Sequence, residues 1–225
     1  MKSKAAAYPY LVWIVLFTVL PLCLITYFAL TDEAGAFTLQ NLSEVSDYAS
    51  VIFRSIWLSA VATAICLVIA YPLAYLISRE RESKQRLYLM LVMLPMWMNF
   101  LLRTYAWMTL LENTGLINRL LGVFGIGPFG MINTQGAVIL GMVYNYVPFM
   151  ILPLYSVMQK IDNRLIEAAQ DLGANSGNVF SKVVLPLSMP GVMTGITMVF
   201  VPAVSTFIIS RMLGGGSNLM IGGLI

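Results

Sequence analysis

The sequence predicts an all-α fold, a polytopic bundle of transmembrane helices, on three observations. Hydrophobic residues make up 59% of the 225 residues and charged residues only 10%, and the mean hydropathy of +0.83 is far above that of an ordinary soluble domain. Five apolar runs reach the roughly 20 residues that a helix needs to cross a bilayer. None of these runs alternates polar and apolar residues with a period of two, so a transmembrane β-barrel is excluded.

The predicted spans belong to one transmembrane domain over residues 1–225 and cover residues 11–30, 56–77, 87–111, 136–158 and 183–209. At about 1.5 Å per residue, each span is roughly 30 Å long or more. The first follows two lysines, as a signal peptide would, but its apolar run is too long and no convincing cleavage site follows, so we expect a retained helix. Only the third span contains a charged residue, Arg103, as expected for helices in lipid.

The basic residues predict the orientation of the chain. If the spans alternate, nine basic residues lie on one side and three on the other, and the richer side should be cytoplasmic. The larger group is Lys2, Lys4, Arg79, Arg81, Lys84, Arg86, Lys160, Arg164 and Lys182, and the smaller is Arg54, Arg119 and Arg211. We therefore expect a multi-pass protein of the cell (plasma or inner) membrane with a cytoplasmic N-terminus. Five spans would end outside, so we also expect that a sixth span is missing from this sequence.

Composition also excludes several classes of function. The net charge is only +3 and the basic residues are scattered, so binding to nucleic acid is not expected. The chain has no histidine, and both cysteines, Cys23 and Cys66, lie in apolar runs, so neither a metal site nor a disulfide framework is predicted. The sequence also lacks a G-x-x-x-x-G-K-[ST] phosphate loop. We expect no ATP site, no cofactor and no catalytic residue in this chain.

The loop before the fifth span, about residues 160–182, predicts two short amphipathic helices on the cytoplasmic side. Asp162 can cap the first helix, and Gly173 can end it in the left-handed conformation. The helix would have an apolar side and a charged side, formed by Leu165, Ala168, Ala169 and Leu172 and by Arg164, Glu167 and Asp171. Ser176 can cap the second helix, before Pro186 disturbs the entry into the span. Such a pair either docks in a groove of a partner protein or rests on lipid headgroups.

The same loop resembles the cytoplasmic signature of ABC importer permeases. The shared pattern is EAA, a Gly-Ala pair, a phenylalanine and a Leu-Pro pair, carried here by Glu167, Ala168, Ala169, Gly173, Ala174, Phe180, Leu185 and Pro186. Residues 94–111, 141–155 and 213–225 look like the spermidine/putrescine permease subfamily. The resemblance implies a type I importer fold with a sixth helix. It also implies that these signature residues, with Asp171 beside them, couple the chain to an ATPase subunit.

The resemblance further implies the partners and the solute. The partners would be a dimer of ATP-binding subunits, a second homologous permease and an extracellular solute-binding protein, and the solute would be a polyamine. Another small solute is an alternative, because the predicted spans contain no Asp or Glu to attract a dication. Alternatives of other classes are an ATP-independent channel or secondary carrier, which needs ionisable residues in the midplane, and a membrane scaffold without a path.

Polar residues inside the spans are candidates for a substrate path. Asn99, Arg103 and Trp107 are four residues apart and share one face of the third span. A charge within a span indicates a functional site, although Arg103 could equally reach the outer headgroups. Tyr144 and Asn145 lie near the middle of the fourth span. They would either line the path or form hydrogen bonds between helices.

Overall fold

The chain is helical almost throughout in the computed structural model, which describes residues 8–32, 35–39, 41, 45–218 and 220–223. The described residues contain no β-strand, only a single antiparallel bridge between Thr31 and Phe37. Among them, four helices are long and apolar enough to cross a membrane, and a pair bent by 85° makes a fifth crossing if it is counted as one span. The prediction of an all-α, polytopic membrane protein is therefore confirmed.

The chain forms two compact units, residues 1–50 and 51–225. In the first unit, α1 (Tyr8–Ile14), a π-helical turn (Val15–Val19) and α2 (Leu20–Ala29) follow one another as a single apolar helix. The Asn41 amide closes the turn after it by donating to the carbonyl oxygens of Phe28, at 3.2 Å, and Thr31, at 3.1 Å. A 3₁₀ turn (Val45–Tyr48) then leads to the next helix. Lys2 and Lys4, which contribute to the predicted orientation, lie outside the described residues.

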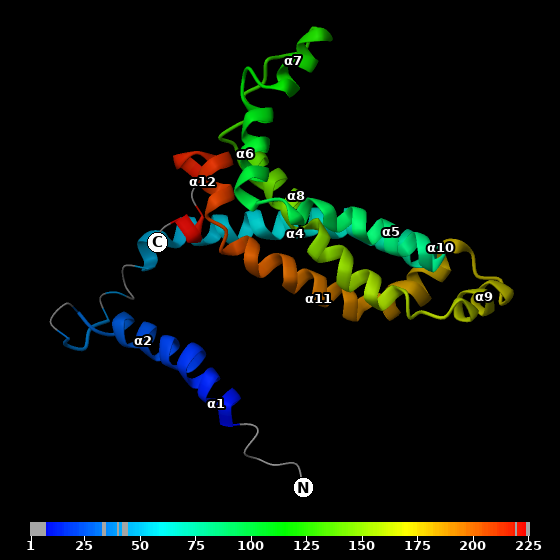
Figure 1. The fold of residues 1–225 in the computed structure, drawn as a ribbon, viewed down its shortest axis with the longest axis horizontal. Coiled ribbons are helices and arrows are strands. Elements are labelled where there is room, and N and C mark those ends of the chain that lie inside the picture. Colours follow the sequence, from blue (N-terminus) through cyan, green and yellow to red (C-terminus); the bar gives the residue numbers. More distant parts are fainter. Residues whose placement is uncertain (1–7, 33–34, 40, 42–44, 219, 224–225) are drawn as a thin grey trace. The chain divides into compact units, whose positions relative to one another are not determined.

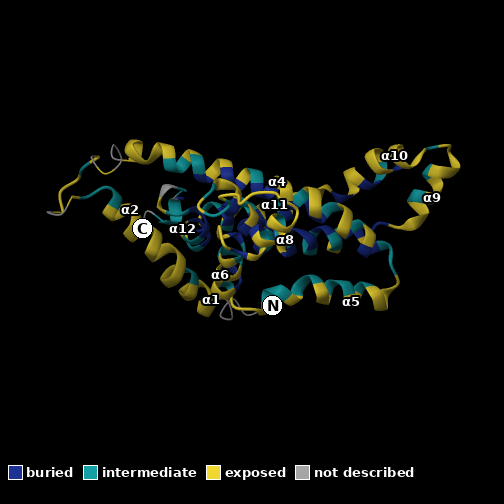
Figure 2. Ribbon diagram, turned by 90° about the horizontal axis from the view of Figure 1, so that it is seen from above, coloured by how far each residue is buried: buried dark blue, intermediate teal, exposed yellow. Residues whose placement is uncertain are grey.

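The core of the second unit lies where three long helices meet, α4 (Ala49–Arg79), α8 (Gln135–Met158) and α11 (Leu185–Val204) (Figure 1). The buried side of α4 is a row of residues four apart, most of them small: Leu58, Ala62, Cys66, Ala70 and Ala74. Small side chains allow helices to approach closely in a membrane, where apolar burial does little to drive helix association. Figure 2 shows the buried residues concentrated in these three helices.

The helix α11 lies against α8 through two glycines four residues apart. A Cβ atom added at Gly191 would lie 3.0 Å from the Pro153 carbonyl oxygen, and one at Gly195 would lie 2.6 Å from Met150 Sδ. A side chain at either position would therefore press on α8. This spacing is the small-xxx-small pattern of closely packed membrane helices, which accounts for the glycines in an otherwise bulky apolar run.

The third predicted span, residues 87–111, is not one continuous helix. It is divided into α5 (Glu82–Met93), a 3₁₀ turn (Leu94–Trp97) and α6 (Phe100–Leu111), and α7 (Leu116–Val123) follows. The helical axis bends by 85° at this break. Proline has no N–H to donate, so Pro95 interrupts the α-helical hydrogen-bond pattern where α5 gives way to the 3₁₀ turn. Asn99 then starts α6 as its cap, accepting a hydrogen bond from the Leu101 N–H at 2.8 Å.

The fifth predicted span, residues 183–209, also ends differently. It stops at Val204, and a separate helix α12 (Ile208–Gly214) follows a break of three residues. Beyond it, two 3₁₀ turns (Gly216–Asn218 and Ile221–Gly223) cover the described part of the glycine-rich end. The Ile221 N–H donates to Ser55 Oγ at 2.8 Å, so this stretch lies beside the beginning of α4.

Candidate functional site

The first candidate site is the helix α9 (Asn163–Asp171), at the same end of the second unit as the C-terminus of α4 (Figure 1). Asp162 caps its start as predicted, because its Oδ1 accepts the Arg164 N–H at 2.9 Å. Its end is a Schellman motif, in which the N–H groups of Gly173 and Ala174 donate to Gln170 and Ala169 at 2.8 and 3.0 Å. Gly173 has φ +83°, the left-handed conformation expected of the terminating glycine.

The second short helix, α10 (Ser176–Val179), continues through a π-helical turn (Phe180–Val184) into α11. The prediction that Ser176 caps it is wrong. The cap is Asn175, which has extended backbone angles and accepts the Asn178 N–H at its Oδ1 at 2.8 Å, while Ser176 is the first helical residue. Asparagine is as good a cap as serine, so residue type alone could not decide between two adjacent candidates.

Two faces of α9 have different surroundings. Ile166 and Ala169 face the chain and, with Ala174, pack on a small cluster formed by Ile161, Val179 and Val184. Of the predicted apolar side, Ala169 therefore faces inward, whereas the other three residues point outward: Leu165 is 49% exposed, Leu172 is 89% exposed, and Ala168 between them is exposed. Glu167 and Asp171 are exposed too. The outward face of α9 thus combines an apolar stripe with two carboxylates, and nothing in the described chain covers it.

Phe180 and Pro186 lie where the segment joins α11. The Phe180 ring is half-exposed and meets the Tyr71 ring edge-on, with 5.5 Å between centroids. Beside it is a groove of about 280 Å³ lined by Tyr75, Ile166, Gln170, Ser176, Val179 and Phe180. Pro186 is exposed in the first turn of α11, within the continuous helical stretch Ser176–Val204, where its missing N–H removes one helical hydrogen bond.

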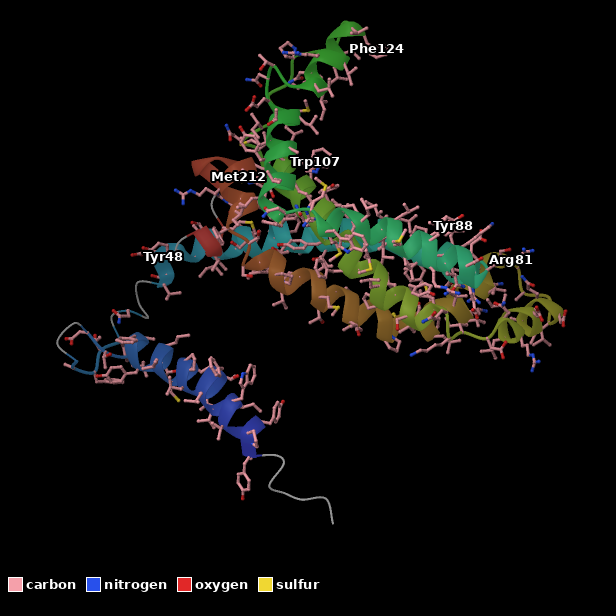
Figure 3. All side chains as sticks on the ribbon, in the orientation of Figure 1. Tyr48, Arg81, Tyr88, Trp107, Phe124 and Met212 are labelled. Atoms are coloured by element: carbon pink, nitrogen blue, oxygen red, sulfur yellow. The ribbon has the colours of Figure 1, made fainter. Side chains whose placement is uncertain are left out.

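The second candidate site lies between α6 and α8. Trp107 on α6, labelled in Figure 3, meets Tyr144 on α8 edge-on, with 5.4 Å between ring centroids. Arg103, one turn before Trp107, is 8% exposed, and its guanidinium leans back over the Phe100 ring at 5.9 Å. Its Nε and Nη1 atoms are buried and have no hydrogen-bond partner in the described part of the chain. A buried charge of this kind within a membrane helix is commonly functional.

Asn145 is the other polar residue of this site. It is 2% exposed, and its amide group donates to the Gly141 carbonyl oxygen of its own helix at 2.8 Å. Its Oδ1 atom is buried and accepts no hydrogen bond from any described residue. Asn99, in contrast, is exposed and occupied in capping α6. The structure therefore brings Trp107 and Tyr144 together, with Arg103 one turn before Trp107 on α6, Asn145 directly after Tyr144 on α8, and Asn99 at the break.

The described residues contain no group of three His, Cys, Asp or Glu side chains that could hold a metal ion.

Sequence reasoning missed polar residues on α4 that contact the α9 region, among them Arg79, whose Nη1 donates to the Ile161 carbonyl oxygen at 3.2 Å. The available signal was the spacing of Tyr71, Tyr75 and Arg79, four residues apart at the end of an apolar helix.

Comparison with known proteins shows extensive similarity. A family described as "Binding-protein-dependent transport system inner membrane component" matches residues 67–225. The spermidine/putrescine transport system permease protein PotB of Haemophilus influenzae is 41% identical over 95% of this chain and 78% of its own length. PotB of Escherichia coli K12 is 38% identical over 95% of this chain and 81% of its own length. The inner membrane ABC transporter permease protein YdcU of the same strain is 29% identical, covering 83% of this chain and 64% of YdcU.

Proposed function

Because the chain belongs to the family of binding-protein-dependent transport system inner membrane components, we propose that it is a permease subunit of an ATP-driven ABC importer that takes up spermidine and putrescine. Its helices form one transmembrane domain and half of a gated path, and a second homologous permease supplies the other half. A dimer of ATP-binding subunits drives the pair from the cytoplasm, and an extracellular binding protein delivers the solute. The polyamine assignment rests on the names of relatives 38 to 41% identical.

The exposed face of α9 is the observation that carries this proposal. Leu172 is 89% exposed, and Leu165 and Ala168 extend the same stripe. Covering one such leucine would contribute about 1.5–3 kcal/mol, whereas leaving it in water gains nothing for the fold. A partner groove with an apolar floor and a basic edge would cover the stripe and meet Glu167 and Asp171. We infer that this partner is the ATPase subunit and that residues 160–182 are the coupling segment, with Gly173 and Ala174 ending its helix and Phe180 and Pro186 joining it to α11.

Orientation and path follow from the same proposal. Coupling to a cytoplasmic ATPase places α9 and the N-terminus in the cytoplasm, in agreement with the distribution of basic residues.

We place the substrate path at the contact of α6 and α8. Trp107 and Tyr144 offer aromatic faces, which attract ammonium groups even where no carboxylate is present. Arg103 and Asn145 supply polar groups beside them, and Asn99 lies at the entrance to α6.

The docking proposal can be tested by copurification from cells that express the complete importer. We expect Leu172→Asp or Glu167→Lys to release the ATPase and abolish uptake, while the permease still inserts into the membrane. Leu120→Asp is the matched control, because Leu120 is a 56% exposed leucine on α7 and should leave the ATPase bound. Unchanged ATPase copurification with Leu172→Asp would remove the docking hypothesis.

The solute can be tested separately, with the complete importer reconstituted in vesicles. We expect uptake of labelled spermidine or putrescine that requires both ATP and the binding protein. A clear preference for another small solute would cancel the polyamine assignment and leave the importer assignment intact. Uptake without any ATPase subunit would instead indicate a channel or secondary carrier.

A further inference from the structure

The last turns of α4 carry a row of residues directed at the coupling segment. Tyr71, Tyr75 and Arg79 are four residues apart, so they lie on one face of the helix. Each contacts a different part of the α9 region, as the following contacts show. We refer to these three residues as the α4 face.

Arg79 binds the beginning of α9. Its Nη1 atom donates to the Ile161 carbonyl oxygen at 3.2 Å and to Asn163 Oδ1. Ile161 ends the turn after α8 and Asn163 is the first residue of α9, so one guanidinium binds both sides of the cap at Asp162. The same guanidinium lies 5.2 Å from the centre of the Tyr75 ring, a cation–π contact that fixes its direction.

Tyr71 binds the other end of the segment. Its hydroxyl group shares a hydrogen bond with Ser188 Oγ at 2.8 Å, and its ring meets Phe180 edge-on. Phe180 follows α10 directly, and Ser188 lies in the first turn of α11. Tyr75, between the other two residues, packs on the cluster that receives Ile166 and Ala169 of α9.

A fourth residue ties the end of α4 to α8. The Gln85 amide donates to the carbonyl oxygens of Ser78, at 3.2 Å, and Glu80, at 2.7 Å. Its Oε1 atom accepts the Tyr155 hydroxyl at 2.7 Å. These bonds satisfy carbonyl groups that a helix leaves free at its C-terminus. They also connect the end of α4 to α8 through Gln85 of α5.

We propose that the α4 face is a positioning surface that holds the coupling segment rigidly on α4, so that a displacement of α9 is passed to α4. The inference rests on the proposed function, since it takes α9 as the element that the ATPase displaces. Arg79, Tyr71 and Tyr75 are positioning residues, because they act through α9 and α11. Without them, α9 would be held only by its two connections, around residues 160–162 and 172–175, and by the small cluster of Ile161, Val179 and Val184, none of which belongs to α4.

The remaining atoms of Arg79 support a role beyond stability. Its Nε and Nη2 are buried and have no hydrogen-bond partner among the described residues. A side chain kept only for stability would be expected to have its buried donors paired, since an unpaired buried donor lowers stability. The bonds that Arg79 does make both come from Nη1 and reach two points of the α8–α9 turn together, the Ile161 carbonyl oxygen and Asn163 Oδ1.

The test uses the complete importer in vesicles and compares solute transported with ATP hydrolysed. With Arg79→Ala, we expect normal ATPase copurification and ATP hydrolysis within about twofold of wild type, while solute moved per ATP falls about tenfold. Asn163→Ala should lower the same ratio less, and should add nothing in the Arg79→Ala background, because both changes remove one contact. Arg81→Ala is the matched control: Arg81 is an exposed arginine at the same end of the unit (Figure 3), two residues further along the chain, and should leave the ratio unchanged.

Two outcomes would overturn the inference: an unchanged transport ratio in Arg79→Ala, or a parallel loss of ATP hydrolysis and transport that leaves their ratio intact. If Arg79→Ala does not accumulate in the membrane, Tyr71→Phe decides, because it removes the bond to Ser188 but keeps the ring beside Phe180. We expect it to lower the ratio about threefold, and an unchanged ratio would count against the inference. A failure of the proposed function would give a different result. In that case the ATPase would still copurify with the Leu172→Asp variant, in which the α4 face is intact.

Discussion

Replacing Gly191 with alanine should loosen the contact between α8 and α11. The added Cβ atom would lie 3.0 Å from the Pro153 carbonyl oxygen, 3.1 Å from Val157 Cβ and 3.2 Å from Leu154 Cα. Carbon atoms in contact prefer separations of roughly 3.5–4.0 Å. The three neighbours belong to one turn of α8, and two of them are backbone atoms. They cannot yield individually, so the helices must separate by about half an ångström.

The expected loss is the balance of two terms. Overpacking a tight contact typically costs about 1–3 kcal/mol, whereas alanine is favoured over glycine within a helix by about 1 kcal/mol. The net change is a destabilisation of about 1 kcal/mol, which corresponds to a fall in melting temperature of about 2–4 °C for a chain of this size. The assay is thermal unfolding of the purified protein in detergent micelles.

Two other glycines provide matched controls. At Gly195 the added atom would lie only 2.6 Å from Met150 Sδ, but this is a flexible thioether that can turn aside, so Gly195→Ala should lower the melting temperature less. Gly122 on α7 has no atom within 4 Å of an added Cβ, so Gly122→Ala should not lower it at all. If Gly191→Ala melts at or above wild type, or above Gly195→Ala, the rigid contact assigned to Gly191 is refuted.

Three further predictions concern single side chains. Asn118→Ala should speed limited proteolysis of residues 112–129, because it removes three side-chain hydrogen bonds of 2.9–3.1 Å that close this loop; Arg119→Ala should not. Asn145→Leu should leave the melting temperature unchanged or raise it, since it removes a buried unpaired oxygen. The same variant should lower uptake. A large fall in stability would show instead that Asn145 serves packing. Gly173→Ala should weaken ATPase binding up to about tenfold in a pull-down titration. The reason is that a backbone φ of +83° at this position costs alanine about 1 kcal/mol. Gly177→Ala in α10 should not weaken ATPase binding.

The long spans were the most predictable part of the fold. The predicted span at residues 136–158 is α8, which covers Gln135–Met158, and the one at 56–77 lies within α4, Ala49–Arg79. Both follow from the length and charge of an apolar run, because lipid requires every backbone polar group to be bonded within the helix. Such a criterion reports that a helix exists, and it is insensitive to where the helix ends.

The breaks were missed for that reason. Residues 87–111 are apolar throughout, apart from a few polar side chains, so a criterion of hydropathy joins α5 to α6. The sequence did contain the signals, since Pro95 cannot continue a helical hydrogen-bond pattern and Asn99 is a strong start residue four positions later. The break after Val204 has a weaker signal, the polar pair Ser205-Thr206. In both cases the helix ends at particular residues, which the mean hydropathy of the run does not reveal.

The candidate coupling segment shows the same division between local and distant information. Its cap at Asp162 and its terminating Gly173 are local and were predicted. Which side of α9 faces the chain was not predicted, because its inward residues pack on a cluster of Ile161, Val179 and Val184 together with Tyr75 of α4, and only the fold brings these residues together. Three residues of the predicted apolar side, Leu165, Ala168 and Leu172, point outward, whereas Ala169 faces the chain. Only the structure shows that Leu172 is uncovered.

Buried polar atoms without partners mark where this fold departs from greatest stability. In the described chain such atoms belong to Ser59, Arg79, Arg103 and Asn145, and each typically costs about 1–3 kcal/mol. An apolar residue of similar size at any of these positions would avoid that loss, so stability does not explain them. Arg79 lies beside the coupling segment, whereas Arg103 is on α6 and Asn145 on α8, the two helices joined by the Trp107–Tyr144 contact. A transporter that switches between two arrangements needs them to have similar free energies. A polar group that is unpaired in one arrangement and paired in the other favours the arrangement in which it is paired. We therefore expect the contact of α6 with α8 to change most between states.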